Sequence, residues 1–235
     1  MVSMSLESII PKIKKSIPMI FSIKDGKIIG TGTGFVYQEY GTVVTCAHVV
    51  SEDGVDIMLR FSDEDDPMPA KVVLLDSEHD IALLSFDDAE KRKTPLEYDD
   101  TDVAEGKAII FSGYPLGIND LTTHQGIISS KINDDLGMER YSIDGSVNPG
   151  NSGGPLMSID GKVIGIINAT RQENAAYIRQ IKSLPQVGAV SILGLDLIKM
   201  LNSIVDNLQL GIGYAVPAYY IPKRATKKEN KHEKR

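Results

Sequence analysis

The stretch Asn148-Pro149-Gly150-Asn151-Ser152-Gly153-Gly154-Pro155-Leu156 is the most informative part of the chain. Glycines on both sides of Ser152 allow a tight loop that exposes the serine hydroxyl and lets a carbonyl group approach the backbone closely. The backbone amides of Gly150 and Ser152, with Asn151 between them, could then point at one spot and stabilise an oxyanion. A loop of Gly, Asn and Ser is on its own more often a simple turn, so other residues must supply the evidence for chemistry.

The chain also contains a candidate base for this serine. A serine hydroxyl is a poor nucleophile until a base removes its proton, and histidine is the usual base near neutral pH. Of the four histidines, His48 ends the apolar run Val44-Thr45-Cys46-Ala47, where a polar ring needs a partner or a purpose. A buried structural histidine is the alternative for His48. His79, His124 and His232 lie in polar or charged surroundings and are expected to be structural or solvated.

An acid is needed to fix the imidazole tautomer and to stabilise the charged ring. Asp80 is the candidate, because it enters the strongly apolar run Ile81-Ala82-Leu83-Leu84 from a turn. Asp76 and Glu78 compete with it, but both precede that run and are expected to be more exposed. The alternative for Asp80 is a strand-start aspartate that makes only local hydrogen bonds.

Turn residues divide the chain into about twelve short apolar segments rich in Val, Ile and Thr, which is typical of a sandwich or barrel. These candidate strands are Ile17–Ile23, Ile28–Tyr37, Val43–Cys46, Asp56–Phe61, Ala70–Leu75, Ile81–Phe86, Lys107–Ser112, Leu121–Ser129, Arg140–Ile143, Pro155–Ile159, Lys162–Ala169 and Ile212–Val216. The polar stretch Asp87–Gly106 divides them into two equal groups and is expected to link two halves. Three-and-four spacing of apolar residues predicts an amphipathic helix over Gly194–Gln209, stopped by Gly211.

The expected organisation therefore has two halves and a tail. The N-terminal half covers 1–88, a linker covers 89–106, and the C-terminal half covers 107–222. The interval 171–210 contains the predicted helix. The tail, 223–235, carries seven Lys or Arg and two Glu, and is expected to be disordered.

Composition excludes several classes of protein. With 42% hydrophobic residues, the chain of 235 residues can build a sizeable core. A net charge of -7 argues against a general nucleic-acid binder. The basic tail is expected to act as a solubilising end of the chain. The less favoured alternative is that this tail recruits nucleic acid or an anionic membrane. The single cysteine excludes a disulfide framework and a zinc site built on paired thiolates, and no cofactor or metal is expected. No apolar run is long enough to span a membrane.

The N-terminal segment does not have the pattern of a signal peptide. Lys12, Lys14 and Lys15 are followed by an apolar run of only about five residues that contains Pro18, where a signal peptide needs roughly 7–15. A first strand and turn, and a cytoplasmic location, are therefore expected. An export signal upstream of this sequence is the alternative.

Three segments together resemble the chymotrypsin-fold serine proteases, in that family's chain order of His, Asp and Ser: Thr45–His48, Asp80–Leu84 and Gly150–Leu156. The likeness is closest to the bacterial HtrA-type protease domains, and it covers roughly residues 17–170 and 211–222. Further stretches similar to landmarks of that group are Gly30–Val36, Gly113–Gly117, Gly126–Ser129 and Ile212–Pro217.

The resemblance implies an all-β fold of two six-stranded antiparallel barrels, with His48 and Asp80 on the first and Ser152 on the second. It implies a serine endopeptidase acting on protein or peptide substrates, in which His48 takes the Ser152 proton and Asp80 holds the imidazole. The alternative is a latent or inactive protease-fold protein that acts as a binding or scaffold module until activated. A regulatory partner, a homo-oligomer or the 171–210 insertion could control it.

The resemblance also implies a specificity pocket. Its residues are Ser146 at the base, where trypsins carry an aspartate, and Ile166, Ile167, Asn168 and Tyr214 along the walls. A neutral pocket is expected to prefer small or medium apolar side chains. The sequence departs from the family's pattern in three ways. No PDZ-like domain follows the protease region, and Cys46 precedes the histidine, where a small buried filler is expected. The interval 171–210 is an insertion in the C-terminal barrel, where a compact relative would have a short loop.

Overall fold

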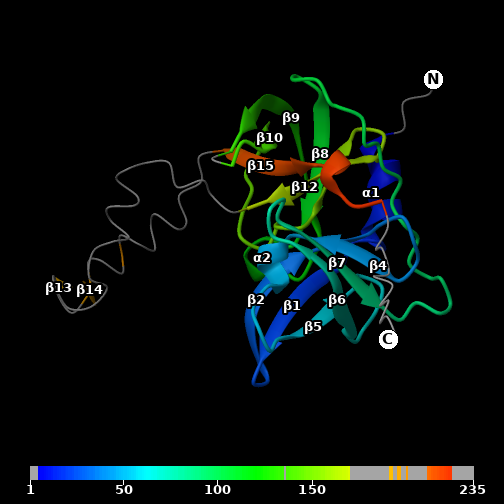
Figure 1. The fold of residues 1–235 in the computed structure, drawn as a ribbon, viewed down its shortest axis with the longest axis vertical. Coiled ribbons are helices and arrows are strands. Elements are labelled where there is room, and N and C mark those ends of the chain that lie inside the picture. Colours follow the sequence, from blue (N-terminus) through cyan, green and yellow to red (C-terminus); the bar gives the residue numbers. More distant parts are fainter. Residues whose placement is uncertain are drawn as a thin grey trace, which may run out of the picture.

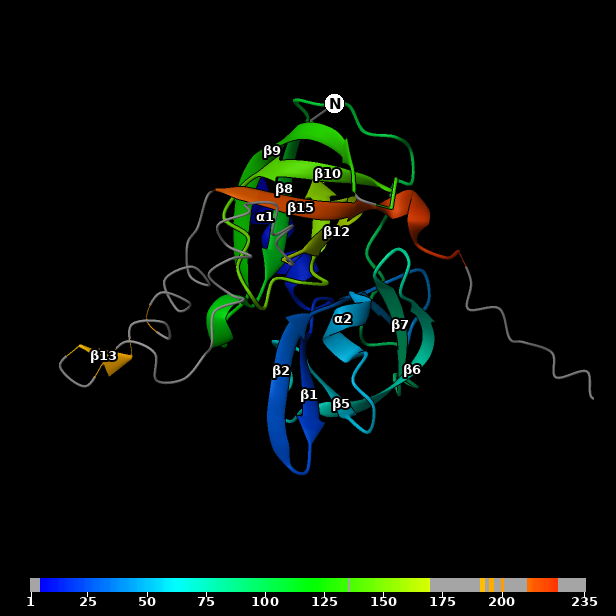
Figure 2. The same ribbon diagram turned by 60° about the vertical axis from the view of Figure 1, so that its left-hand side comes forward.

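The computed structural model describes residues 5–134, 136–169, 191–192, 195–196, 200 and 211–223. Within these residues the chain forms mostly strands, gathered mainly in a sheet and a barrel that lie one above the other (Figure 1). The blue-to-cyan sheet of the N-terminal half and the green-to-orange barrel of the C-terminal half keep this arrangement in the turned view (Figure 2). The expected all-β fold is confirmed.

The N-terminal sheet curls so that its two edges are consecutive in the chain. Its strands are β1 (Met19–Lys24), β2 (Lys27–Thr33), β3 (Phe35–Val36), β4 (Thr42–Thr45), β5 (Asp56–Arg60), β6 (Met68–Asp76) and β7 (Ile81–Phe86), in the order β2-β1-β5-β6-β7-β4-β3. Only Gly34 separates β2 from β3, so one bent segment forms both edges, and the single strand predicted over Ile28–Tyr37 is two strands. A Cβ at Gly34 would lie 2.6 Å from Val43 Cγ1, so the bend requires glycine.

The C-terminal half is a closed six-stranded barrel in the order β10-β15-β12-β11-β8-β9. Its strands are β8 (Ala108–Gly113), β9 (Thr122–Asn133), β10 (Glu139–Asp144), β11 (Pro155–Ser158), β12 (Val163–Asn168) and β15 (Ile212–Pro217). Each overlaps a strand predicted from the sequence. Two 3-10 turns accompany them, η1 (Pro115–Gly117) after β8 and η2 (Ala218–Tyr220) after β15.

Two helices lie where the sequence predicts none. The helix α1 (Leu6–Lys14) precedes β1 and buries Ile9 and Ile13, which are four residues apart and therefore share one face. Pro11 lies inside α1, so tertiary packing stabilises this helix more than local propensity does. The helix α2 (Ala47–Val50) is a single turn that follows β4.

Much of the predicted insertion and tail lies outside the described residues. In 171–210 the structure describes β13 (Ser191–Ile192) paired with β14 (Leu195–Asp196), and a helical Met200. The helix predicted over Gly194–Gln209 is therefore wrong at Leu195 and Asp196, which pair as a strand. Apart from the helical Met200, the other residues of that helix and the tail beyond Lys223 lie outside the description. No helix among the described residues is long and apolar enough to cross a membrane.

One hydrophobic core joins the two halves. It contains Phe35 and Ile81 from the N-terminal sheet and Ile110, Met157 and Ile166 from the barrel, all fully buried. Each half also has a separate core of its own. Because burial of apolar surface holds the halves together, loops at their junction keep a fixed relative position.

The connector between the halves touches both of them. Leu96 forms a bridge with Tyr37 of the N-terminal half, and Tyr98 forms one with Val163 of the barrel. The ammonium group of Lys93 is buried and pairs with carboxylates of the N-terminal half, as a buried charge requires. The connector therefore reinforces the docking of the two halves.

Candidate active site

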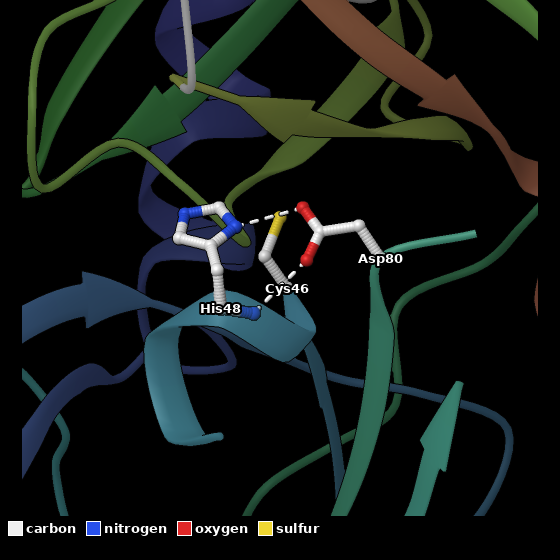
Figure 3. Close-up of side chains that lie close together, drawn as sticks. All are labelled: Cys46, His48 and Asp80. Atoms are coloured by element: carbon white, nitrogen blue, oxygen red, sulfur yellow. Dashed lines mark hydrogen bonds and ion pairs between the residues drawn. The ribbon is translucent and has the colours of Figure 1, made fainter. Parts of the chain in front are cut away.

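His48 and Asp80 face each other at one end of the N-terminal sheet. His48 lies in α2, just after β4, and Asp80 lies in the turn before β7. Asp80 Oδ2 lies 2.7 Å from His48 Nδ1, and Asp80 Oδ1 accepts a hydrogen bond from the His48 backbone amide at 2.9 Å (Figure 3). A carboxylate at Nδ1 keeps the ring proton there, so Nε2 carries the lone pair that can accept a proton.

The backbone around Asp80 is held in an uncommon conformation. Asp80 has a φ of +60°, in the left-handed region that aspartate tolerates better than most residues. Its carbonyl accepts a hydrogen bond from the Ala47 amide at 3.2 Å, and the preceding carbonyl, of His79, accepts one from the Arg140 guanidinium at 3.4 Å. Both peptides that flank Asp80 are thus held in place, which aims its side chain at His48.

Ser152 reaches the imidazole from the other half of the molecule. It lies in the loop before β11, and its Oγ is 3.0 Å from His48 Nε2. Thr33, at the end of β2, places this loop: its amide donates to the Ser152 carbonyl at 2.8 Å and its hydroxyl donates to the Gly150 carbonyl at 2.6 Å. The structure therefore brings the three predicted residues together across the junction of the two halves.

Two glycines shape the loop that carries Ser152. Gly150 has a φ of +97° and Gly153 a φ of +85°, both in the region that favours glycine. A Cβ at Gly150 would lie 2.2 Å from the Tyr114 carbonyl oxygen, and one at Gly153 would lie 2.1 Å from that of Thr33. The loop is therefore closed to side chains at both positions.

The peptide before Gly150 has a defined orientation. The Pro149 carbonyl accepts a hydrogen bond from the Leu116 amide at 2.8 Å, so across the trans peptide the Gly150 N–H points away from Leu116. Among the described residues, the amides of Gly150 and Ser152 donate to no backbone acceptor. The amide of Asn151 differs from the expectation, because it donates to the Asn148 carbonyl at 3.0 Å and is used within the loop.

Two neighbours support the pair formed by His48 and Asp80. Asn168 Nδ2 donates to Asp80 Oδ2 at 2.9 Å, a contact that its predicted place in the specificity pocket did not include. The Cys46 thiol donates to the Ile167 carbonyl at 3.3 Å and is fully buried. Burial, and then the charge of Asp80, raise the pKa of the Cys46 thiol well above its ordinary value, so the group is a neutral packed thiol.

Only part of the predicted specificity pocket has access to solvent. Ile166 is fully buried in the core between the halves, and Ile167 is fully buried in the barrel core. Neighbouring residues of a strand point to opposite faces, and both faces of β12 are covered, so these two side chains line no open pocket. Ser146 is exposed, while Asn168 and Tyr214 are half-buried and pair across β12 and β15.

Val147, which follows Ser146, is a core residue that the sequence patterns did not predict. A Cβ at Gly213 would lie 2.2 Å from Val147 Cγ2, so glycine is needed on β15 to make room for this valine. An isolated glycine inside a strand often marks such a close approach, and Gly213 was therefore the available signal. Val147 is buried in the barrel core, so it fixes the backbone beside Ser146 and does not itself line an open pocket.

The other described histidines have structural surroundings. His79 Nδ1 lies 2.7 Å from Asp76 Oδ2, in a pair that resembles the one between His48 and Asp80, and its ring lies against that of Tyr220 with 4.5 Å between the centroids. His124 stacks on Phe111 with 4.9 Å between the ring centroids, and burial lowers the pKa of His124. Both observations agree with the structural roles expected for these residues.

The family model of a trypsin-like peptidase domain matches residues 32–166, more than half of the chain. A probable periplasmic serine endoprotease, DegP-like, of Halomonas elongata is 35% identical over 158 residues, which are 66% of this chain and 32% of that protein. The counterpart in Chlamydia trachomatis is 34% identical over 169 residues, 69% of this chain and 33% of that protein. The chain thus spans about a third of the length of these relatives.

Solved structures resemble the whole fold. The HtrA-type protease AlgW with a tripeptide superposes with a TM-score of 0.67 at 22% identity, covering 92% of this chain and 60% of that one. The active form of the Rv3671c protease from M. tuberculosis gives a TM-score of 0.64 at 23% identity, covering 89% of this chain and 79% of that one. At such identities these likenesses concern the fold, and they agree with the family match in sequence. The chain belongs to the trypsin-like peptidase family and carries a chymotrypsin-fold protease domain of the HtrA type.

Proposed function

We propose that this chain hydrolyses peptide bonds in proteins or peptides as a serine endopeptidase. The observation that carries the proposal is the hydrogen-bonded line from Asp80 through His48 to Ser152, with 2.7 Å at the first contact and 3.0 Å at the second. The same constellation performs acyl transfer on unrelated folds, so the geometry is a stronger argument than the fold itself.

In the proposed reaction, Ser152 Oγ attacks the substrate carbonyl while His48 Nε2 takes the hydroxyl proton. The ring then gives this proton to the leaving amine, and Asp80 stabilises the charged imidazolium between the two steps. The amides of Gly150 and Ser152 would hold the oxyanion, and each such donor is typically worth about 3 kcal/mol. Water activated by His48 finally releases the acyl group from Ser152, and no cofactor enters these steps.

Release of fluorescent peptides from a quenched protein substrate tests the proposal. Ser152→Ala, purified in parallel, is the control for contaminating proteases. Equal hydrolysis by both proteins would show that the activity does not come from this site.

Substrate preference follows from the neutral surroundings of Ser146. We expect cleavage after small or medium apolar side chains, because Ser146 is uncharged and Asp144, the nearby acid, is exposed. Arg and Lys should be poor substrates, since a buried cation without a partner has a large desolvation cost. A peptide-library profile read by mass spectrometry measures this preference. Dominant cleavage after Arg would contradict it and would indicate an acid supplied by the 171–210 insertion.

One contact favours a latent resting state, in which Ser152 is restrained until the protein is activated. The Ala169 amide donates a hydrogen bond to Ser152 Oγ at 3.1 Å. A donor on the attacking oxygen withdraws electron density from it, and the Ala169 backbone occupies space beside the nucleophile. Ala169 directly follows β12 and directly precedes the region that leads into the insertion. Movement of this segment would therefore free Ser152, which couples the insertion to the proposed activity.

Removal of the Ala169 N–H should release this restraint. Ala169→Pro eliminates the donor, whereas Ala169→Ser keeps it and serves as the matched control. Because a neutral hydrogen bond contributes about 1 kcal/mol, we expect Ser152 of the proline variant to react with a small fluorophosphonate roughly 3–10 times faster. A small reagent is used because it does not need to pair with β12. Equal rates in two variants of equal thermal stability would show that the contact does not restrain Ser152.

The names of the relatives bear on the location of this protein. The names of the relatives in Halomonas elongata and Chlamydia trachomatis call them periplasmic, so they give no support to the cytoplasmic location predicted from the sequence. An exported protein, the alternative left open by the sequence, fits these relatives better. Protein or peptide substrates are the partners that the proposed activity requires, and a regulatory partner or a second copy would act through the insertion.

A further inference from the structure

A third donor lies beside His48 and Asp80. The Cys46 sulfur, a ring nitrogen of His48 and a carboxylate oxygen of Asp80 all lie within 4.8 Å of one another. In Figure 3 the Cys46 side chain points up between the imidazole and the carboxylate. The proposed hydrolysis uses the ring and the carboxylate but gives the thiol no role.

The three groups differ in their access to solvent. Cys46 is fully buried, whereas the side chain of Asp80 is 20% exposed and that of His48 is 39% exposed. A cation would therefore approach from the His48 side, which is the most exposed of the three. His48 sits on the short helix α2 and its ring has room to shift toward solvent.

The chemistry of the three donors suits one class of cation. A thiolate, an imidazole and a carboxylate are ligands that zinc accepts, and three protein ligands leave its fourth position for water. Charge also favours a divalent ion: a Cys46 thiolate and the Asp80 carboxylate carry two negative charges, which the ion would neutralise. Without a cation the thiolate is unfavourable, because it would be buried next to Asp80.

We propose that Cys46, His48 and Asp80 form a binding site for a thiophilic divalent cation such as zinc, and that occupancy of this site switches Ser152 off. These three residues supply all the protein ligands of the site. The inhibitory consequence rests on the proposed peptidase function.

Inhibition follows from the proton balance at His48. On binding, the Cys46 thiol loses its proton to solvent and the sulfur bonds to the metal. The Nδ1 lone pair of His48 also bonds to the metal, so the ring's single proton must reside on Nε2. That nitrogen then donates to Ser152 instead of accepting its proton, and the base is lost. One proton is released for each cation bound, and no redox change occurs.

Binding requires a limited rearrangement. Metal–ligand distances of about 2.1 Å in a tetrahedral site separate nitrogen and oxygen ligands by roughly 3.4 Å. His48 Nδ1 and Asp80 Oδ2 are now 2.7 Å apart, so this pair must separate by about 0.7 Å. The Cys46 sulfur, now within 4.8 Å of both, must lie roughly 3.6 Å from each and must give up its hydrogen bond to the Ile167 carbonyl. Asn168 and the His48 amide hold Asp80 in place, which leaves the His48 ring and the Cys46 thiol as the parts that move.

This site departs from an expectation based on sequence. The single cysteine excludes a zinc site built on paired thiolates, and the sequence predicts no metal. The partners of Cys46 are instead a histidine two residues later and an aspartate brought close by the turn before β7.

Cobalt binding to the full chain tests the site without relying on activity. Titration of the metal-free protein with Co²⁺ should produce a near-ultraviolet charge-transfer band from thiolate to cobalt and release one proton per cobalt bound. The band should disappear when Zn²⁺ displaces the cobalt. Cys46→Ser should lose the band, because serine can still donate to the Ile167 carbonyl but is a poor ligand for soft cations. Cys46→Ala provides a second variant in case the serine disturbs folding.

The pair formed by His79 and Asp76 supplies a matched control. It has the same 2.7 Å contact but no thiol, so His79→Ala should keep the cobalt band. No thiolate band in the wild-type protein, or a band that persists in both folded Cys46 variants, would overturn the proposed site.

The functional consequence has its own measurement. The rate at which a fluorophosphonate labels Ser152 is measured with and without zinc. Each variant is compared with its own rate in the absence of metal. At about ten times the dissociation constant, zinc should leave roughly a tenth of the wild-type rate, and the Cys46 variants should be insensitive. A cobalt band with undiminished labelling would overturn the inhibition, whereas a cobalt band in a protein that never reacts at Ser152 would overturn the peptidase proposal alone.

Discussion

Ser152→Ala and His48→Ala should each lower kcat/KM on a cleavable peptide by about a million-fold, because the members of a triad act as a unit. Without Ser152 no acyl-enzyme can form, and without His48 the hydroxyl proton has no acceptor at 3.0 Å. Initial rates of peptide cleavage measure both losses. The melting temperature of each variant should stay near that of the wild type, since His48 is partly exposed and Ser152→Ala removes a single oxygen.

The two variants also test each other. The double variant should be no slower than either single variant, because removing one member already disables the other. If His48→Ala kept substantial activity, a different base would serve Ser152. His79 is then the histidine to replace next, because it directly precedes Asp80 in the chain.

Asp80→Asn should lower kcat by about ten-thousand-fold, because an amide holds the imidazole in the wrong tautomer. The structure shows why the carboxylate has no substitute here. Its two oxygens accept three hydrogen bonds, from the His48 amide, His48 Nδ1 and the Asn168 side chain. Asparagine offers one oxygen and one N–H₂ group, so at least one contact would bring two donors together.

Asp76→Asn is the control for this substitution. It changes an aspartate that also lies 2.7 Å from a histidine ring, yet it should leave cleavage of the same peptide within about threefold, as expected of a half-buried pair outside the site. Equal losses in the two variants would mean that the effect comes from the stability of the turn before β7 and not from orientation of His48.

Much of the architecture follows from patterns that local physics makes strong. Strand β7 has the bounds predicted for it, Ile81–Phe86, because a continuous apolar run between turns can only be a buried strand in this setting. The loop around Ser152 was recognisable from its glycines. The structure explains why they are needed, because a Cβ at Gly150 or Gly153 would collide with the backbone of Tyr114 or Thr33. The structure brings the three predicted residues together as that pattern required.

The remaining features depend on tertiary contacts that no short window contains. Helix α1 forms around Pro11 because Ile9 and Ile13 pack into the core that joins the halves. The bend at Gly34 is set by Val43, a neighbour on another strand.

The pocket and its surroundings show the same dependence. Ile166 and Ile167 are apolar, as pocket walls would be, but the barrel and the core between the halves bury both. Asn168 has a polar side chain that could point either way in a strand; its contact with Asp80 depends on how the halves dock.

Activation of Ser152 by His48 is the central step of the proposed reaction, and a serine-directed fluorophosphonate reports on it without any peptide substrate. Intact-protein mass spectrometry should show one adduct per molecule, peptide mapping should place it on Ser152, and His48→Ala should abolish it. Adduct formation that is slow in the wild type and faster in Ala169→Pro would agree with the contact at 3.1 Å. Two results would show that His48 does not activate Ser152. One is the absence of an adduct on Ser152 in both the wild type and Ala169→Pro under metal-free conditions. The other is an adduct that forms equally well in His48→Ala.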